Sequence, residues 1–327
     1  MSDNRNVFFT VLCLTAILLL PFAGCNEENK AVDFYIDGVL LTELDERELA
    51  VERLNLAVES DENFSRAYSL LGQVYHDMND YEKSAASYEK ATQLRPASFK
   101  DFFNLGRVYE IMENFAQAVN AYVRACEIDP DHLQAHISAA KSSSKIKDYD
   151  RALRFGQRAE EIDPNLGDTQ MMLAEIYESM KDYDGAVGSY KRALEIDSNS
   201  PEIMVPLAVA YLKTDRYEPA IELLTSVTQL QPENGDAYQY LGYCHLKLSD
   251  PNAAIESYSR AVEINDRDWQ AHRGLGVAYM LKVLNSDDQA LKPKAIEHWR
   301  ASLDINPDQA NSEALLELIR KHSKKVE

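Results

Sequence analysis

The stretch RAYSLLGQVYHDMNDYEKSAASYEKATQLRP, residues 66–96, contains two amphipathic segments separated by a short break. Within each segment, apolar and small residues recur every three or four positions, which is the pattern of an α-helix with one packed face. Asn79-Asp80 separates the two segments, and Arg95-Pro96 ends the second, because the residue before a proline avoids helical geometry. The stretch therefore predicts a helical hairpin.

The hairpin pattern returns along most of the chain at a spacing of 34 residues. Steps of this size meet only glycine or alanine, at Gly38, Gly72, Gly106, Ala140, Ala174, Ala208, Gly242 and Gly276. A fixed period of this length indicates stacked supersecondary units that bury their apolar faces against one another. A small residue in this column would let the two helices of a hairpin approach closely.

The other columns of the repeat resemble those of the tetratricopeptide repeat, in which aromatic, Leu-Gly, Tyr, Ala, aromatic and Pro positions follow at fixed spacing. One unit shows them as Phe102, Leu105-Gly106, Tyr109, Ala118, Tyr122, Ala125 and Pro130. The resemblance covers residues 31–309 and implies an all-α, right-handed superhelical solenoid of about eight hairpins. The expected units are 31–64, 65–98, 99–132, 133–166, 167–200, 201–234, 235–268 and 269–309.

The eighth unit breaks the spacing. The small residue expected at position 288 is Asp288, and the pattern resumes at Ala295, so seven residues are inserted, about two helical turns. Either the first helix of this unit is longer, or residues 285–293 form a loop before the second helix. Residues 310–327 then read as a capping helix and tail. The fourth unit carries Ser143 and Gly156 in place of aromatic residues, which predicts a softer joint there.

The amino terminus resembles an export signal. Residues 7–24, VFFTVLCLTAILLLPFAG, are apolar and follow Arg5. Ala23-Gly24-Cys25 is similar to the lipobox of bacterial lipoproteins, although Phe22 stands where Leu is usual. The resemblance implies a signal peptide over residues 1–24, lipidation of Cys25 and a short tether over residues 25–30.

By the same resemblance the protein is lipid-anchored in the bacterial cell envelope, in the outer membrane and facing the periplasm, because Asn26 rather than Asp follows the cysteine. Two alternatives stay open for the apolar run. Its 18 residues are just long enough for a single-span membrane anchor, which Pro21 fits poorly, and the run could also be a buried core helix.

Composition narrows the possible partners of the chain. The net charge of −20 over 327 residues argues against nucleic acid and against broad contact with anionic lipid. Four cysteines occur, without metal-ligand spacing or a disulfide framework: Cys13, Cys25, Cys126 and Cys244.

No residue pattern in the chain predicts catalysis, a cofactor or a metal. His132 and His136 are four residues apart, as helical zinc ligands can be, but His136 occupies the aromatic column and its packing explains it. Cys244 reads as a small buried residue. There is no phosphate-binding glycine loop, nucleophile elbow or metal motif, so the chain is not expected to be an enzyme.

The resemblance places the first helix of each hairpin on the inner wall of the superhelix. The periodicity then predicts which side chains line this partner groove: Phe103, Arg107, Ile137, Lys141, Lys145, Met171, Val205, Val209, Leu212, Tyr243 and Leu246, with Gln73, Gln239, Arg273 and Val277 in the same columns. Among them Arg107, Lys141 and Lys145 form a basic group. The apolar members form a strip that the fold does not need to bury.

The predicted function is a protein–protein interaction scaffold or assembly factor that binds a protein or peptide segment in this groove, apolar groups on the strip and an acidic group at the basic residues. Two alternatives remain. The superhelix could close on itself, or the assignment of faces could be off by one residue. A different function, that of a permanent structural subunit joined through its convex face or its ends, would leave the groove without a ligand.

Overall fold

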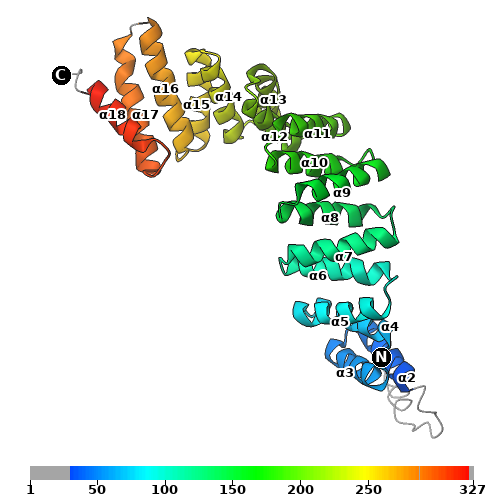
Figure 1. The fold of residues 1–327 in the computed structure, drawn as a ribbon. Helices are drawn as coiled ribbons and strands as arrows, with labels where there is room; N and C mark the ends of the chain where they lie inside the picture. Colours follow the sequence, from blue (N-terminus) through cyan, green and yellow to red (C-terminus); the bar gives the residue numbers. More distant parts are fainter. Residues whose placement is uncertain (1–29, 287, 324–327) are drawn as a thin grey trace, which may run out of the picture. The chain divides into compact units, whose positions relative to one another are not determined.

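The computed structural model describes residues 30–286 and 288–323, and every regular element within them is helical (Figure 1). It contains seventeen α-helices, α2–α18, and one short 3-10 helix, η2. The all-α repeat fold predicted from the sequence is confirmed. The predicted signal peptide, the lipidation site Cys25 and nearly all of the tether lie outside the described residues.

Consecutive α-helices pair into eight hairpins. The first four are α2 (Lys30–Glu43) with α3 (Arg47–Ser60), α4 (Ser65–Asp77) with α5 (Tyr81–Leu94), α6 (Phe99–Ile111) with α7 (Phe115–Ile128), and α8 (Leu133–Lys145) with α9 (Tyr149–Ile162). The next three are α10 (Gly167–Ser179) with α11 (Tyr183–Ile196), α12 (Pro201–Lys213) with α13 (Tyr217–Leu230), and α14 (Gly235–Lys247) with α15 (Pro251–Ile264). The eighth joins α16 (Trp269–Ser286) through η2 (Gln289–Leu291) to α17 (Lys292–Ile305), and the predicted capping helix is α18 (Ser312–Ser323).

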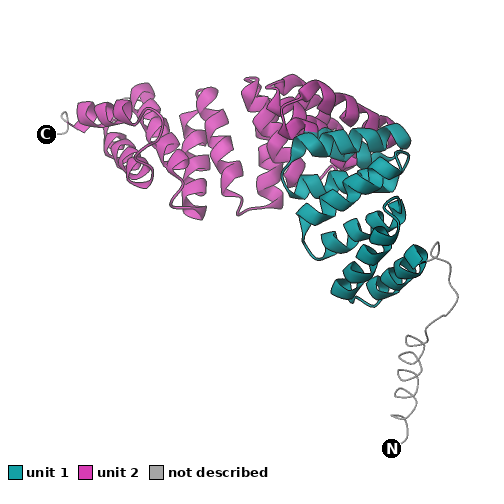
Figure 2. Cartoon of the chain, turned by 60° about the horizontal axis from the view of Figure 1, so that its bottom comes forward, with its two compact units in different colours: residues 1–142 teal, residues 143–327 magenta. Residues whose placement is uncertain are grey.

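The chain divides into two compact units, residues 1–142 and residues 143–327 (Figure 2). The boundary lies inside α8, the first helix of the fourth repeat, next to Ser143. This is the repeat in which the sequence lacks the usual aromatic residues. The softer joint predicted there stays a prediction, and the two units are described separately below.

The turn inside each of the first seven hairpins shows the 34-residue period at the level of the backbone. Residues with positive φ recur at this spacing, at Asp45, Asn79, Glu113, Lys147, Lys181, Asp215 and Ser249. In the second repeat the Asn79 N–H donates to the His76 carbonyl and the Asp80 N–H donates to the Tyr75 carbonyl, both at 2.9 Å. These two bonds form a Schellman motif, which ends a helix on a left-handed residue.

The eighth hairpin lacks this turn. The residue in the same column is Val283, which is buried and helical, so α16 continues to 18 residues where α14 has 13. After it, η2 leads into α17 at Lys292. The alternative of a longer first helix is therefore confirmed. The loop over residues 285–293 is wrong as predicted, because Asn285 and Ser286 belong to α16 and Lys292 and Pro293 belong to α17.

The small-residue column makes room for a ring on the second helix of the same hairpin. A Cβ atom added to Gly72, Gly106 or Gly242 would lie 2.8, 2.6 or 2.6 Å from the ring atoms of the tyrosine sixteen positions later. Such distances are well inside van der Waals contact. The expectation that small residues let the two helices approach is thus met in a specific way, because the space is filled by Tyr88, Tyr122 and Tyr258.

The two ends of the array differ in their exposed surface. At the carboxyl end, Leu315 and Ile319 of α18 are buried against Met280, Ile296 and Trp299. At the amino end, α2 buries only Ala31 and Gly38. Among residues 30–286 and 288–323, no helix combines the length and the apolar character needed to cross a bilayer.

Candidate functional site

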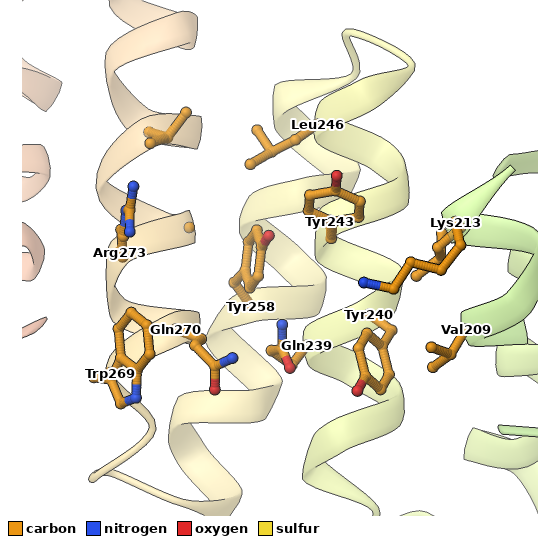
Figure 3. A pocket seen from close by; sticks show the side chains of 13 residues that line it. Val209, Lys213, Gln239, Tyr240, Tyr243, Leu246, Tyr258, Trp269, Gln270 and Arg273 are labelled. Atoms are coloured by element: carbon orange, nitrogen blue, oxygen red, sulfur yellow. The ribbon is translucent and has the colours of Figure 1, made fainter. Parts of the chain in front are cut away.

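A pocket of about 600 Å³ opens between α12, α14 and α16, entirely within residues 143–327 (Figure 3). These are the first helices of the sixth, seventh and eighth hairpins. The lining comprises Val209, Leu212, Lys213, Gln239, Tyr240, Tyr243, Leu246, Tyr258, Trp269, Gln270, Arg273, Gly274 and Val277.

The repeat spacing explains why these side chains meet. Val209, Tyr243 and Val277 are 34 residues apart and occupy one column of three successive first helices. Gln239 and Arg273 occupy the column one turn earlier. Since residues four apart lie on the same face of a helix, the two columns form neighbouring rows across α12, α14 and α16.

Tyr258 reaches the pocket from α15, behind the row of first helices. Its ring fits because Gly274 has no side chain: a Cβ atom there would lie 2.3 Å from Cζ of Tyr258. Gly242 leaves room on the other side of the same ring, with an added Cβ 2.6 Å from Cγ. Two glycines of α14 and α16 therefore hold an aromatic ring between these helices, and Figure 3 shows Tyr258 between them.

The apolar part of the pocket is accessible to solvent. Tyr243 is 37% exposed and Val277 is 36% exposed, whereas Val209, Leu212 and Leu246 are half-buried. Accessible tyrosine and aliphatic side chains grouped in a concave site are typical of protein contact surfaces.

Neighbouring groups hold the Tyr243 ring at the pocket edge. The Lys247 ammonium lies 5.4 Å from the centre of the ring, and the Tyr217 ring meets it edge-on at 6.5 Å between centres. A cation over an aromatic face and an edge-to-face ring pair each favour one orientation of the tyrosine. These two contacts favour the orientation in which the ring lines the pocket.

Both charged side chains that line the pocket are cations. Lys213 extends from the end of α12, and Arg273 lies on α16, where its Nη1 donates to the Ala310 carbonyl at 3.1 Å (Figure 3). No carboxylate is part of the lining. In a chain with a net charge of −20, the pocket thus offers an unusual local preference for an acidic group beside an apolar one.

Seven of the predicted groove residues line this pocket: Val209, Leu212, Gln239, Tyr243, Leu246, Arg273 and Val277. The structure does not place Met171 or Val205 in it. Both are half-buried and pack against the apolar cores of the fifth and sixth hairpins, respectively. Whether any of these residues contacts a partner stays a prediction.

In residues 1–142, Phe103 and Arg107 have different surroundings. Phe103 packs into an aromatic group, with ring centres 5.5 Å from Phe99, 5.7 Å from Tyr122 and 5.3 Å from His132. Arg107 is exposed and lines a smaller pocket of about 240 Å³, together with Gln73, His76, Asp77, Tyr88 and Asn104.

The prediction that Ile137 lines an open groove is wrong, because its side chain is only 6% exposed. All residues from Ala135 to Ala140 are buried, so α8 is covered on more than one face and the assumption of a single buried face fails there. Lys141 and Lys145 are exposed one turn apart on α8. Lys145 lies beyond the unit boundary, so the three-residue basic group stays a prediction.

Sequence reasoning missed six of the lining residues: Lys213, Tyr240, Tyr258, Trp269, Gln270 and Gly274. Trp269 was within reach, because it precedes Arg273 by four residues and so continues the row of Arg273 and Val277 along α16. Lys213 and Tyr240 each follow a predicted lining residue by one position. The prediction left out the positions directly after these lining residues, whereas the pocket includes them.

The histidine and cysteine side chains considered in the sequence analysis are engaged in local hydrogen bonds or buried. The His136 ring nitrogen Nε2 lies 3.0 Å from the Pro130 carbonyl, and Nδ1 of His132 accepts the Ala135 N–H at 3.2 Å at the start of α8. Burial raises the pKa of the Cys126 and Cys244 thiols to about 12, which keeps them protonated and unreactive at neutral pH. In the described part of the chain, no three His, Cys, Asp or Glu side chains are grouped as a metal site.

Comparison with known proteins identifies the repeats. Models described as tetratricopeptide repeat match residues 65–98, 99–132, 178–242 and 235–268. No curated protein matches the sequence.

Several solved structures are similar to parts of this chain. A structure of Naa15/Naa10 bound to HypK-THB is 14% identical, with a TM-score of 0.57 over 86% of this chain and 43% of that one. YrrB, described as a tetratricopeptide protein with an unusual peptide-binding site, is 20% identical, with a TM-score of 0.50 over 57% of this chain and 96% of that one. MamA is 24% identical, with a TM-score of 0.49 over 55% of this chain and 95% of that one. At these identities the likeness concerns the fold alone.

Proposed function

Since residues 65–132 and 178–268 are tetratricopeptide repeats, we propose that this chain is a non-enzymatic scaffold that binds a segment of another protein between α12, α14 and α16. Repeats of this kind serve generally in protein–protein interaction. The observation that carries the proposal is the accessible apolar surface of Tyr243 and Val277 in a concave site. The fold has no need of that surface for its own core.

The lining defines the chemistry of the partner segment. A volume of about 600 Å³ accepts a few large side chains, within the usual range of ligand sites. Tyrosine, valine and leucine side chains favour aromatic or aliphatic anchors, while Lys213 and Arg273 favour a carboxylate beside them. The partner segment therefore carries one or two large apolar residues next to Asp or Glu.

A displayed peptide library tests this chemistry before any natural partner is identified. Peptides selected on the intact protein are expected to combine aromatic or aliphatic residues with Asp or Glu. Their affinity is then measured on a variant carrying Tyr243→Ser and Val277→Ser, and it should fall by about tenfold or more, as for hot-spot side chains. Leu230→Ser, at an exposed leucine outside the pocket, is the matched control.

Two outcomes would reject the pocket as the binding site. One is unchanged affinity of the selected peptides on the double variant, with its helix content intact. The other is an equal loss on the Leu230→Ser control. Raising the salt concentration provides a second measurement, because pairing of Lys213 and Arg273 with partner carboxylates weakens with ionic strength.

We further propose that the scaffold works in the bacterial cell envelope, attached to the outer membrane by lipid on Cys25. The apolar run 7–24 and the sequence Ala23-Gly24-Cys25 support this attachment. Metabolic labelling with an alkyne fatty acid should mark the protein and should fail on Cys25→Ala. A protein that is unlabelled but extracted from membranes only by detergent would favour the single-span anchor instead.

A further inference from the structure

A stripe of exposed aliphatic side chains runs along α2, the first helix of the array. Val32, Ile36 and Leu40 are 44%, 50% and 52% exposed, and Leu44 just beyond the helix is 71% exposed. These four residues, the α2 stripe, follow one another at intervals of four, so they lie on one face. Their Cα atoms span roughly 18 Å along the helix axis, at about 1.5 Å per residue.

A stripe of this kind is unusual on a surface that faces water. Terminal repeats of solenoids need a polar outer face to stay soluble, and at the other end α18 exposes Glu313, Glu317 and Lys321 beside its two exposed leucines, Leu316 and Leu318. The α2 stripe departs from this rule along the length of its helix. A surface of this kind is expected to be covered.

The adjoining sequence indicates what covers it. Residues 25–29 are all that separates α2 from the apolar run 7–24, a maximum reach of roughly 17 Å from Cys25 to Lys30. Whichever form of attachment holds the chain, α2 begins within that distance of the lipid, and the stripe starts at Val32, in the first turn of the helix. We propose that the α2 stripe lies on the membrane surface, in contact with the lipid.

The charges around the stripe select the kind of lipid. Asp33 and Glu43 are exposed on the same helix, Asp37 is half-buried, and Lys30 is the one cation of α2. An excess of acids over bases disfavours an anionic bilayer and leaves a neutral or zwitterionic one. The same acids disfavour a second copy of the chain, because pairing two α2 stripes would bring like charges together in molecules that each carry −20.

This inference rests on the proposed membrane attachment, and photo-crosslinking of the full-length protein tests it. Benzoylphenylalanine at position 36 is compared with the same residue at position 111, because Ile36 and Ile111 are similarly exposed isoleucines in residues 1–142. In phosphatidylcholine vesicles, illumination should attach lipid at position 36 several-fold more than at position 111. In phosphatidylglycerol vesicles at low salt, the yield at position 36 should fall several-fold.

The outcomes separate the inference from the proposals on which it rests. A product of twice the molecular mass at position 36 would assign the stripe to a second copy and overturn the inference. Equal lipid yields at the two positions, or in the two kinds of vesicle, would also overturn it. If Cys25 carries lipid while position 36 yields no lipid adduct, only the inference fails. Peptide binding in the pocket is measured separately and does not depend on any of these results.

Discussion

The first and last hairpins of the array differ in how their outer faces are covered. At the carboxyl end, α18 lies over the last hairpin and buries Leu315 and Ile319 against Ile296 and Trp299. At the amino end no helix among the described residues covers the stripe of α2, and Ile36 stays half-exposed. Among the described residues, the chain thus covers its carboxyl end with α18 and leaves the α2 stripe uncovered.

The difference also appears inside the terminal hairpins. The last hairpin has the largest ring of the small-residue column, Trp299 against Gly276, and a longer first helix. The first hairpin has Leu54 against Gly38, the ordinary helix length, and the left-handed turn at Asp45. One end therefore depends on dense local packing, and the other on the regular features of the repeat.

The largest expected contrast comes from the same substitution at the two ends. Leu315→Ala removes a side chain that is 6% exposed and should lower the free energy of unfolding of the last hairpin by about 2–4 kcal/mol. Leu40→Ala, at 52% exposure, should change stability by less than about 0.5 kcal/mol. Regional hydrogen exchange measures each end separately, as a solenoid requires. Similar losses at both ends would show that the α2 stripe is buried in the free protein.

A second contrast uses glycines of the small-residue column. A Cβ atom on Gly276 would lie 2.2 Å from the Trp299 ring, whereas one on Gly38 would lie 2.6 Å from the outer atoms of Leu54. A rigid indole cannot move aside as a leucine methyl can. Gly276→Ala should therefore cost about 1–3 kcal/mol, the usual range for overpacking, and Gly38→Ala should cost less. Denaturant titration followed by hydrogen exchange of α17 and α3 gives the two values, and a reversed order would contradict this packing account.

A third contrast concerns pH. In the last hairpin, Nδ1 of His272 lies 3.0 Å from Nδ1 of His298, and burial together with the neighbouring His272 lowers the pKa of His298. Glu297 opposes this shift and Lys294 adds to it. Because burial in the folded state favours the neutral form of His298, the stabilisation is present above the ordinary histidine pKa and is lost as the pH falls below it.

Acidification from pH 7.5 to pH 5.5 should accordingly increase hydrogen exchange in α16 and α17 after correction for the intrinsic rate. The first hairpin contains no histidine and provides the internal control. His298→Asn should remove the additional acid sensitivity. Acid opening of the first and last hairpins to the same extent would assign the effect to carboxylates throughout the chain.

Much of the fold followed from the sequence, because the 34-residue column fixes the position of every hairpin. The column does not determine which side chains of each helix are exposed to solvent. Ile137 was assigned to an open face and is buried, since α8 is packed on more than one side. Tyr243 and Val209, by contrast, line the pocket between the first helices of the sixth, seventh and eighth hairpins.

The missed residues show the same limit. Lys213 enters the pocket because its long side chain reaches beyond the column in which its Cα atom lies. Tyr258 enters from the second layer of helices only because Gly274 has no side chain. How far a side chain reaches into the pocket depends on pairs of residues in different hairpins. The pattern of a single repeat carries no information about such pairs.

The smallest expected effect concerns the turn that the first hairpin keeps and the eighth has lost. Asp45 has φ of 60°, a conformation that glycine adopts freely and that aspartate tolerates better than alanine. Asp45→Gly should raise the stability of the first hairpin by about 0.5 kcal/mol, and Asp45→Ala should lower it by about 1 kcal/mol. The Arg47 contact of this exposed aspartate is lost in both variants, so their difference isolates the backbone. Equal stabilities, measured by exchange in α2 and α3, would mean that the conformation of the turn does not contribute to the stability of the first hairpin.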